Sequence, residues 1–163
     1  MTDSHADTRK ASDLFIECLE AEGCEYIFGV PGEENLDFLD SLSRSKQIKL
    51  VLTRHEQGAG FMADGYARAS GRPAACFIIT GPGMTNIATA MGQALADSVP
   101  MLVISSVNRR DTLGRGQGRL HELPSQQQTL AGVSRFSHTL LDPDALPEVL
   151  ARAFAVFSSA RPG

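Results

Sequence analysis

The chain has 163 residues, 42% of them hydrophobic and 21% charged, with a formal net charge of −4 at neutral pH. This is the composition of one soluble globular domain, and the absence of a stripe of Lys or Arg excludes a nucleic-acid-binding surface. The longest apolar run, 99–104, is too short to cross a bilayer, and the polar amino end lacks the apolar core of a signal peptide. We therefore expect a cytoplasmic protein.

Apolar runs and amphipathic segments alternate along the chain after a disordered tail expected at residues 1–10. Short apolar runs ended by turn residues predict buried strands, and apolar residues three and four positions apart predict helices. The expected strands cover 26–30, 48–52, 74–79, 101–106 and 136–141. The expected helices cover 11–22, 33–43, 55–69, 87–95 and 144–158.

Two of these helices carry specific expectations. In the helix at 33–43, Leu36, Leu39 and Leu42 recur on one face, which is what predicts the helix. In the helix at 144–158, Asp144 is the expected N-cap. The polar stretch 108–128 has no periodicity, which is typical of a functional loop or a mobile one.

The order of elements predicts an α/β fold with a parallel sheet and helices on both faces, because the strands are continuous apolar runs separated by helices. Ligands of such sheets bind at the carboxyl ends of the strands. The domain is expected to occupy residues 11–163. The chain ends immediately after a helix, so a last strand of the sheet is expected to be missing.

Cysteine and histidine offer no independent active site. Cys18, Cys24 and Cys76 are an odd number without metal-ligand spacing and are expected to be buried free thiols. No Ser–His–Asp or Cys–His motif is present, so His55 is expected to be structural. We expect no metal site within this chain.

Three loops follow predicted strands, at 31–33, 53–56 and 80–86, and each opens a helix with free backbone N–H groups. The glycines of the third loop either shape a turn or make room for a ligand. A dinucleotide fingerprint is excluded, because its third glycine is replaced by Asn86 and no acidic residue ends the next strand.

Glu56 has two interpretations. A carboxylate in the first turn of a helix is usually solvated and favoured by the helix dipole. Here the small residues Gly58, Ala59, Gly60 and Ala63 predict a closely packed helix that encloses the carboxyl group. An enclosed carboxyl group is suited to exchanging a proton near neutral pH.

Four motifs then support a resemblance over about residues 11–163: "FGVPGEENLDFLDSL", "LTRHEQGAGFMADGYARASGRPA", "TGPGMTN" with "ALADSVPMLVISS", and "SSARPG". They resemble the amino-terminal, pyrimidine-binding domain of thiamin-diphosphate enzymes, in the branch of acetolactate synthase and 2-oxo acid decarboxylases. The motifs occur in the family's order and with nearly the family's spacing. "RHEQ" followed by "ADGYAR" is the most specific pair.

The resemblance implies a role for Glu56. In the family this glutamate hydrogen-bonds a ring nitrogen of the cofactor's aminopyrimidine, and sharing its proton activates the cofactor for attack on a 2-oxo acid, which then loses carbon dioxide. By position, the residues resembling the cofactor-binding loops are Pro31, Gly32, Thr80, Gly81, Gly83 and Asn86.

Two departures from the family pattern matter. The diphosphate and Mg²⁺ are held in the family by another domain with a Gly-Asp-Gly motif, which is absent here, so these 163 residues alone are expected to be inactive. Acetolactate synthases have Phe-Gln-Glu where this chain has Leu120-His121-Glu122. "RLHELPSQQ" and "FSHTLLD" instead resemble the 5-guanidino-2-oxopentanoate decarboxylases, which act on 2-oxoarginine. His121 is then an active-site acid–base or a loop histidine in solvent.

The resemblance also implies partners. The pyrimidine domain of one subunit faces the diphosphate domain of a second, so a homodimer or homotetramer is expected, with 58–69 as a packing face. Some acetolactate synthases bind FAD, which an arginine at the position of Arg161 contacts. The alternatives are a separate pyrimidine-domain subunit of a two-chain decarboxylase and a non-catalytic assembly domain.

Overall fold

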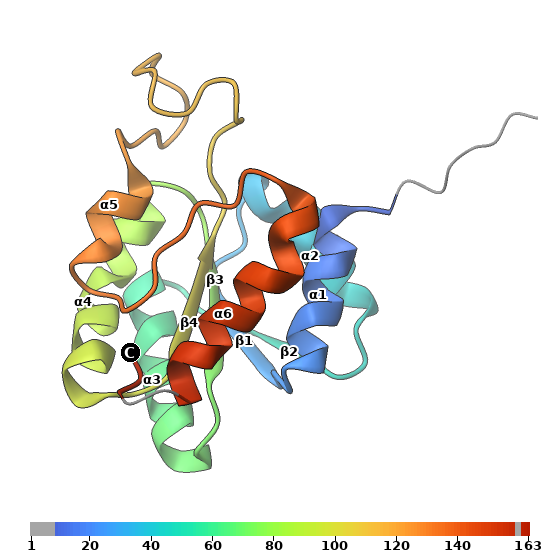
Figure 1. Cartoon of the computed structure of the whole chain (residues 1–163), viewed down its shortest axis with the longest axis vertical. Coiled ribbons are helices and arrows are strands. Elements are labelled where there is room, and N and C mark those ends of the chain that lie inside the picture. Colours follow the sequence, from blue (N-terminus) through green and yellow to red (C-terminus); the bar gives the residue numbers. More distant parts are fainter. Residues whose placement is uncertain (1–8, 159–160) are drawn as a thin grey trace, which may run out of the picture.

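The computed structural model describes residues 9–158 and 161–163, and it contains a four-stranded parallel sheet in the order β2-β1-β3-β4 (Figure 1). The strands are β1 (Tyr26–Gly29), β2 (Lys49–Leu52), β3 (Ala74–Ile78) and β4 (Met101–Ser105). The parallel sheet confirms the expected α/β fold. Most of the expected disordered tail, residues 1–8, lies outside the described residues, as do residues 159–160 of the "SSARPG" motif.

Helices cover both faces of the sheet, as predicted. They are α1 (Ala11–Ala21), α2 (Leu36–Arg44), α3 (Glu56–Ser70), α4 (Pro82–Asp97), α5 (Gln126–Ala131) and α6 (Leu146–Ser158). Figure 1 shows α1, α2 and α6 on one side of the strands and α3, α4 and α5 on the other. Short 3-10 turns, Glu33–Asn35 and Pro143–Ala145, precede α2 and α6.

The two faces are filled differently. Under α1, α2 and α6 the core consists of large side chains such as Leu19 and Leu146, and the rings of Phe38 and Phe77 stack 3.6 Å apart. Between α3 and α4 the core is mostly alanine, and a Cβ added to Gly60 would lie 2.5 Å from the Cβ of Ala90. The absence of a side chain at Gly60 lets these two helices approach closely.

Of the leucines expected on one face of α2, Leu42 is buried and Leu39 packs against the core, while Leu36 is 60% exposed. Two sequence predictions of local structure are wrong. The helix predicted from residue 87 begins at Pro82, since proline at a first helical position loses no hydrogen bond there. Asp142, not Asp144, provides the cap before α6, and its carboxylate accepts a hydrogen bond from the backbone N–H of Asp144.

The strand predicted at 136–141 is also absent: this segment has no regular secondary structure. It runs beside the outer edge of β4, which pairs with β3 alone among the described residues. A strand requires a partner for its backbone hydrogen bonds, and 136–141 does not pair with β4. Its apolar sequence is therefore extended chain bordering a cavity.

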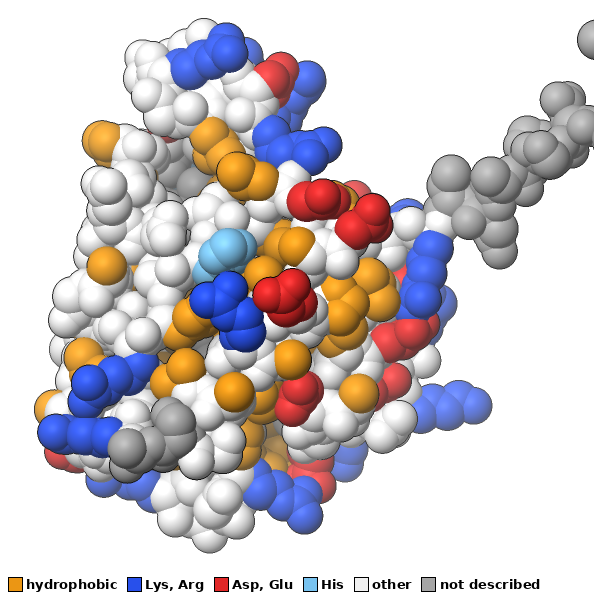
Figure 2. All heavy atoms as spheres, viewed as in Figure 1, with side chains coloured by type: hydrophobic (Ala, Val, Ile, Leu, Met, Phe, Trp, Pro, Cys, Tyr) orange, Lys and Arg blue, Asp and Glu red, His pale blue; other side chains and the backbone are white. Residues whose placement is uncertain are grey.

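Residues 107–124 form a long loop above the carboxyl ends of the strands, at the top of Figure 1. Arg109, Arg110, Arg115 and Arg119 belong to it, and Figure 2 shows basic side chains gathered at its tip. Within the described ranges, no helix is long and apolar enough to cross a membrane.

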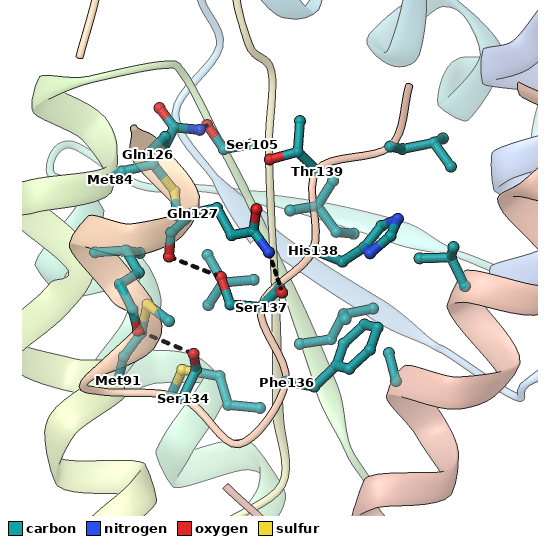
Figure 3. A pocket seen from close by; sticks show the side chains of 18 of the residues that line it. Met84, Met91, Ser105, Gln126, Gln127, Ser134, Phe136, Ser137, His138 and Thr139 are labelled. Atoms are coloured by element: carbon teal, nitrogen blue, oxygen red, sulfur yellow. Dashed lines mark hydrogen bonds between the residues drawn. The ribbon is translucent and has the colours of Figure 1, made fainter. Parts of the chain in front are cut away.

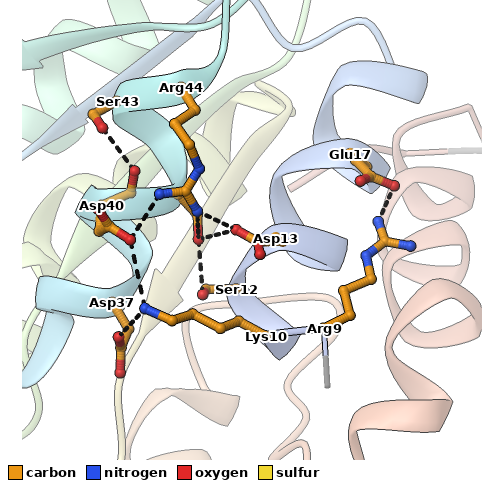
Figure 4. A network of polar contacts seen from close by, with 10 residues as sticks. Arg9, Lys10, Ser12, Asp13, Glu17, Asp37, Asp40, Ser43 and Arg44 are labelled. Carbon is orange, nitrogen blue, oxygen red and sulfur yellow. Dashed lines mark hydrogen bonds and ion pairs between the residues drawn. The ribbon is translucent and has the colours of Figure 1, made fainter. Parts of the chain in front are cut away.

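An exposed polar network joins α1 to α2 (Figure 4). The Arg44 guanidinium donates to Asp13 of α1 and, at 2.7 Å, to Asp40 of its own helix. Lys10, just before α1, donates to Asp37 at 2.9 Å. These ion pairs join α1 and α2 at the surface, and they involve none of the alanines between α3 and α4.

Candidate functional site at the carboxyl ends of the strands

Glu56 is the first residue of α3 and is 8% exposed, which fits the enclosed carboxyl group expected from its small neighbours. His55 precedes it as the N-cap, and its Nδ1 accepts a hydrogen bond from the backbone N–H of Gln57 at 3.1 Å. This contact gives His55 a structural role, as the sequence suggested. This N-cap fixes where α3 begins and therefore where the buried Glu56 lies.

Asn86 holds one oxygen of this carboxyl group. Its Nδ2 donates to Glu56 Oε2 at 2.9 Å, across the interface of α3 and α4. In the described part of the chain no donor lies within hydrogen-bond distance of Oε1. The arrangement leaves Oε1 available to a group from outside the chain.

Gly83 borders the same oxygen. A Cβ at this position would lie 3.6 Å from Glu56 Oε1 and 3.0 Å from Ile79 Cγ1. Any side chain at residue 83 would therefore extend over or beside Oε1. The glycine keeps that space open, so Oε1 is accessible to a hydrogen-bond donor from outside the chain.

Thr80 and Gly81 are committed to contacts within the chain. Thr80 is buried, and its hydroxyl donates to the carbonyl oxygen of Ser106 at 2.8 Å. Gly81 has a φ of +63°, its N–H donates to Gln126 Oε1 at 2.9 Å, and an added Cβ would lie 2.2 Å from the carbonyl oxygen of His121. These two residues tie the start of α4 to the loop after β4 and to α5.

Pro31 and Gly32 form the turn after β1. The Gly32 N–H donates to Asn35 Oδ1 at 2.9 Å, and a Cβ on Gly32 would meet Ile79 Cγ2 at 2.5 Å. Asn35 is buried and also donates to the carbonyl oxygen of Val30 at 3.3 Å. The turn is thus held against the end of β3, and it brings Glu34 to the same rim.

His121 reaches the rim from the long loop. It has a φ of +55°, unusual for a residue with a side chain, and its carbonyl group packs on Gly81. Its Nδ1 is buried without a hydrogen bond and lies 3.9 Å from Glu34 Oε2. The structure thus brings His121 to Gly81, just before α4, and Glu56 to Gly83 and Asn86 in the first turns of α4.

Sequence reasoning missed Glu34, Ser106 and Gln126 as parts of this rim. Glu34 follows the Pro31-Gly32 turn, so its position in the loop after a predicted strand was a usable signal. Gln126 carried none, because its contact with Gly81 depends on how the loop 107–124 returns to the sheet.

A cavity of about 370 Å³ lies elsewhere, along the outer edge of β4 (Figure 3). Its lining combines β4, α5, α6 and the segment 136–140, and it does not include Glu56. Ser137 accepts from Gln127 Nε2 at 2.9 Å through its carbonyl oxygen and donates to the Gln127 carbonyl oxygen at 3.0 Å. These bonds fasten the segment to α5 and leave the mostly apolar space between it and β4 open.

The thiols supply no nucleophile. Burial raises the pKa of Cys24 to about 11, and burial also raises the pKa of Cys76. All three cysteines are free, Cys18 being only partly buried. Over residues 9–158 and 161–163 there is no group of three His, Cys, Asp or Glu side chains placed to hold a metal ion.

The sequence matches the family model described as "Thiamine pyrophosphate enzyme, N-terminal TPP binding domain" over residues 9–130. The chain belongs to this family. The matched segment contains all four strands and the whole rim from Pro31 to His121. The thiamin-diphosphate resemblance expected from the motifs is confirmed.

Curated relatives agree with the family. The chain is 55% identical over 155 residues to "Probable 2-ketoarginine decarboxylase AruI" of Pseudomonas aeruginosa, which covers 95% of this chain and 28% of the relative. It is 40% identical over 157 residues to "Acetolactate synthase 1, chloroplastic" of Zea mays, covering 96% and 24%. It is 37% identical over 155 residues to "Acetolactate synthase, chloroplastic" of Arabidopsis thaliana, covering 95% and 23%. The chain thus spans about a quarter of the length of these relatives.

Proposed function

We propose that this chain is the pyrimidine-binding part of a thiamin-diphosphate enzyme that decarboxylates a 2-oxo acid. The observation that carries the proposal is the Glu56 carboxyl group, enclosed at the rim with Oε2 held by Asn86 and Oε1 free beside Gly83. A carboxylate that only served the helix dipole would be solvated. This one is buried, and the space beside it is kept open.

In this proposal Glu56 Oε1 holds the proton that is exchanged with the aminopyrimidine, and Asn86 prevents the carboxyl group from rotating away. When bound, thiamin diphosphate supplies the carbon that attacks the 2-oxo group and accepts the electrons as carbon dioxide leaves. Pro31 and Gly32 would border the pyrimidine, and the segment from Thr80 to Asn86, which includes the start of α4, would shape the neighbouring wall. The diphosphate and its Mg²⁺ belong to another domain.

The substrate we propose is a 2-oxo acid with a guanidino group, such as 2-oxoarginine. The support is the similarity to a relative whose name states 2-ketoarginine decarboxylase, together with Leu120-His121-Glu122 in place of the Phe-Gln-Glu of acetolactate synthases. His121 would act as an acid–base at the rim. Acetolactate synthesis is the second candidate, supported by the plant relatives.

For assembly we propose a cytoplasmic homodimer or homotetramer in which the second subunit's diphosphate-binding domain completes the site. The exposed face of α3 supports this, since Phe61 and Met62 are 41% and 46% exposed and an added Cβ on Gly58 or Gly65 would meet nothing within 4 Å. An apolar face with small residues is suited to packing against another subunit.

FAD is proposed only as a structural cofactor that the visible absorption spectrum of the purified protein would reveal. Arg161 donates here to Ser98 Oγ at 2.7 Å and to the Ala96 carbonyl oxygen at 2.6 Å. To contact FAD, Arg161 would have to break these two hydrogen bonds.

The test is carbon dioxide release from 2-oxoarginine and from pyruvate by the complete encoded protein, with thiamin diphosphate and Mg²⁺ supplied. We expect release from 2-oxoarginine and a loss of roughly 100-fold or more in Glu56→Gln, which keeps the shape and removes the exchangeable proton. Gln57→Ala is the matched control, because the backbone N–H of residue 57 still donates to His55 Nδ1 and the N-cap of α3 is kept.

Each other outcome is informative. Full activity in a folded Glu56→Gln variant would contradict the role of Glu56. No release from the folded wild-type protein with either acid would favour the non-catalytic assembly domain. Activity that appears only after a second chain is added would identify this chain as a separate subunit of a two-chain decarboxylase.

A further inference from the structure

Glu34 and His121 face one another at the rim beside Thr80 and Gly81, whereas Glu56 lies beside Gly83 and Asn86 in the first turns of α4. Glu34 Oε2 and His121 Nδ1 are 3.9 Å apart. The Glu34 side chain is only 17% exposed, and no Lys or Arg of the described residues lies within ion-pair distance of it. A mostly buried carboxylate without a cationic partner needs donors, because burying an unpaired charge is costly.

One donor is already in place. The backbone N–H of Thr80 donates to Glu34 Oε2 at 3.1 Å, and Thr80 is itself fixed through its hydroxyl to the Ser106 carbonyl oxygen. Glu34 is therefore anchored to the carboxyl end of β3. Its carboxylate has several further lone pairs that can accept hydrogen bonds.

His121 is fixed as firmly from its own side. Asn108 Nδ2 donates to the Leu120 carbonyl oxygen at 2.9 Å, and the Glu122 carboxylate accepts from the backbone N–H groups of Arg119 at 3.0 Å and Gly116 at 2.9 Å. These bonds hold the residues on both sides of His121. Its left-handed backbone and the contact with Gly81 then direct the imidazole toward Glu34.

The ring nitrogen that faces Glu34 is the one buried side-chain polar atom without a hydrogen bond in the described part of the chain. The 3.9 Å gap is too long for a direct hydrogen bond, but a small rotation of either side chain closes it. The imidazole is 31% exposed while Nδ1 is buried, so its accessible part lies away from Nδ1.

We infer that Glu34 is a positioning residue for His121: it accepts a hydrogen bond from Nδ1–H and so holds the neutral imidazole in the tautomer whose free lone pair is on Nε2. A carboxylate behind a histidine selects the tautomer and the ring orientation in this way. The catalytic use of this arrangement rests on the proposed function, since a base at the rim requires a lone pair on the accessible nitrogen.

The test is the tautomer of His121 itself, read from the ¹⁵N resonances of ring-labelled histidine in the folded protein and assigned with His121→Gln. We expect the Nδ1–H form to predominate in the wild type. Glu34→Gln should lower the ratio of the two tautomers roughly fivefold, because a neutral acceptor binds Nδ1–H more weakly than a carboxylate. The carbonyl oxygen of the Gln side chain can still accept the hydrogen bond from the Thr80 N–H, so we expect the variant to fold.

Glu33→Gln is the matched control. It removes the same charge from the neighbouring, exposed residue of the same 3-10 turn and is expected to leave the tautomer ratio unchanged. Glu34→Asp is a second variant that keeps the charge and shortens the reach, and it should also lower the ratio. Equal ratios in the wild type and all three variants would overturn the inference.

Kinetics of the complete protein separate this role from substrate binding. A positioning role predicts that Glu34→Gln lowers kcat for 2-oxoarginine and for pyruvate alike, with KM nearly unchanged. A rise in KM for 2-oxoarginine alone, with the tautomer unaltered, would mean that Glu34 binds the guanidinium and would overturn the proposal. If the wild type releases no carbon dioxide, the proposed function fails, and the ¹⁵N result still decides the pairing of Glu34 with His121.

Discussion

The two faces of the sheet differ in the size of the side chains between their helices. The face under α1, α2 and α6 is filled by large side chains, with Leu19 and Leu146 almost completely buried and Phe38 stacked on Phe77. On the other face, α3 and α4 meet largely through alanine and glycine and so approach each other closely, although the same cluster also holds large buried side chains such as Ile78 and Ile87. The contact between α3 and α4 therefore depends on small side chains, which the helix contacts of the first face do not require.

The difference accounts for where the candidate site lies. Glu56 and Asn86 are on α3 and α4, and their 2.9 Å hydrogen bond requires the two helix starts to be close together. Large residues at this interface would separate the carboxyl group from the amide. The alanine-rich face is therefore the one able to enclose a carboxyl group and still leave one oxygen accessible.

The largest expected effect is on the face of large side chains. Leu19→Ala removes a side chain with no exposure to solvent and leaves a cavity between α1 and the sheet. We expect the free energy of unfolding, measured by urea denaturation, to fall by roughly 2–5 kcal/mol. If the free energy of unfolding fell by no more than an ordinary surface substitution lowers it, the neighbouring side chains must have filled the cavity. The contrast between the two faces would then disappear.

A smaller effect is expected from adding a methyl group to the close-packed face. In Gly60→Ala the new Cβ would lie 2.5 Å from the Cβ of Ala90, so α3 and α4 must separate, at a cost of about 1–3 kcal/mol. Gly65→Ala is the matched control on the same helix, because an added Cβ there meets nothing within 4 Å. It should stabilise the protein by roughly 0.5–1 kcal/mol through helix propensity. Equal effects of the two substitutions would contradict the close approach.

The smallest effects concern the ion pairs of the two faces. On the α3–α4 face, Arg68 Nε donates to Asp64 at 2.7 Å and Nη2 donates to Asp97, and the Asp64 side chain is only 10% exposed. Arg44 of the network in Figure 4 pairs with more exposed carboxylates. We expect Arg68→Ala to lower the melting temperature more than Arg44→Ala, since it leaves a buried carboxylate unpaired.

Acid should weaken both networks. Arg68 lowers the pKa of Asp97, and a hydrogen bond from Ser41 followed by one from Arg44 lowers the pKa of Asp13. A carboxyl group whose pKa is lower in the folded state stabilises the protein at any pH above its unfolded-state pKa, which is 3.8 for aspartate. This stabilisation is lost as the pH falls through the folded-state pKa. The difference in melting temperature between wild type and Arg68→Ala should therefore shrink in acid, and a constant difference would exclude the ion pairs as its cause.

Local pattern was sufficient for most of the fold. The apolar runs at β1, β2, β3 and β4 and the periodicity of α1, α3 and α6 predicted elements within a few residues of their observed bounds. The small residues after Glu56 predicted an enclosed carboxyl group, because helix packing depends directly on side-chain size. The motif from "RHEQ" to "ADGYAR" predicted the family.

The tertiary structure alone decided the rest. The apolar sequence at 136–141 has the composition of a strand, yet pairing is a property of two segments, and this one borders a cavity beside β4. The face of α2 was likewise set by the position of the sheet, which left Leu36 outside. The approach of His121 to Glu34 joins residues 87 positions apart through the path of a loop without periodicity, so no local pattern in the sequence encodes it.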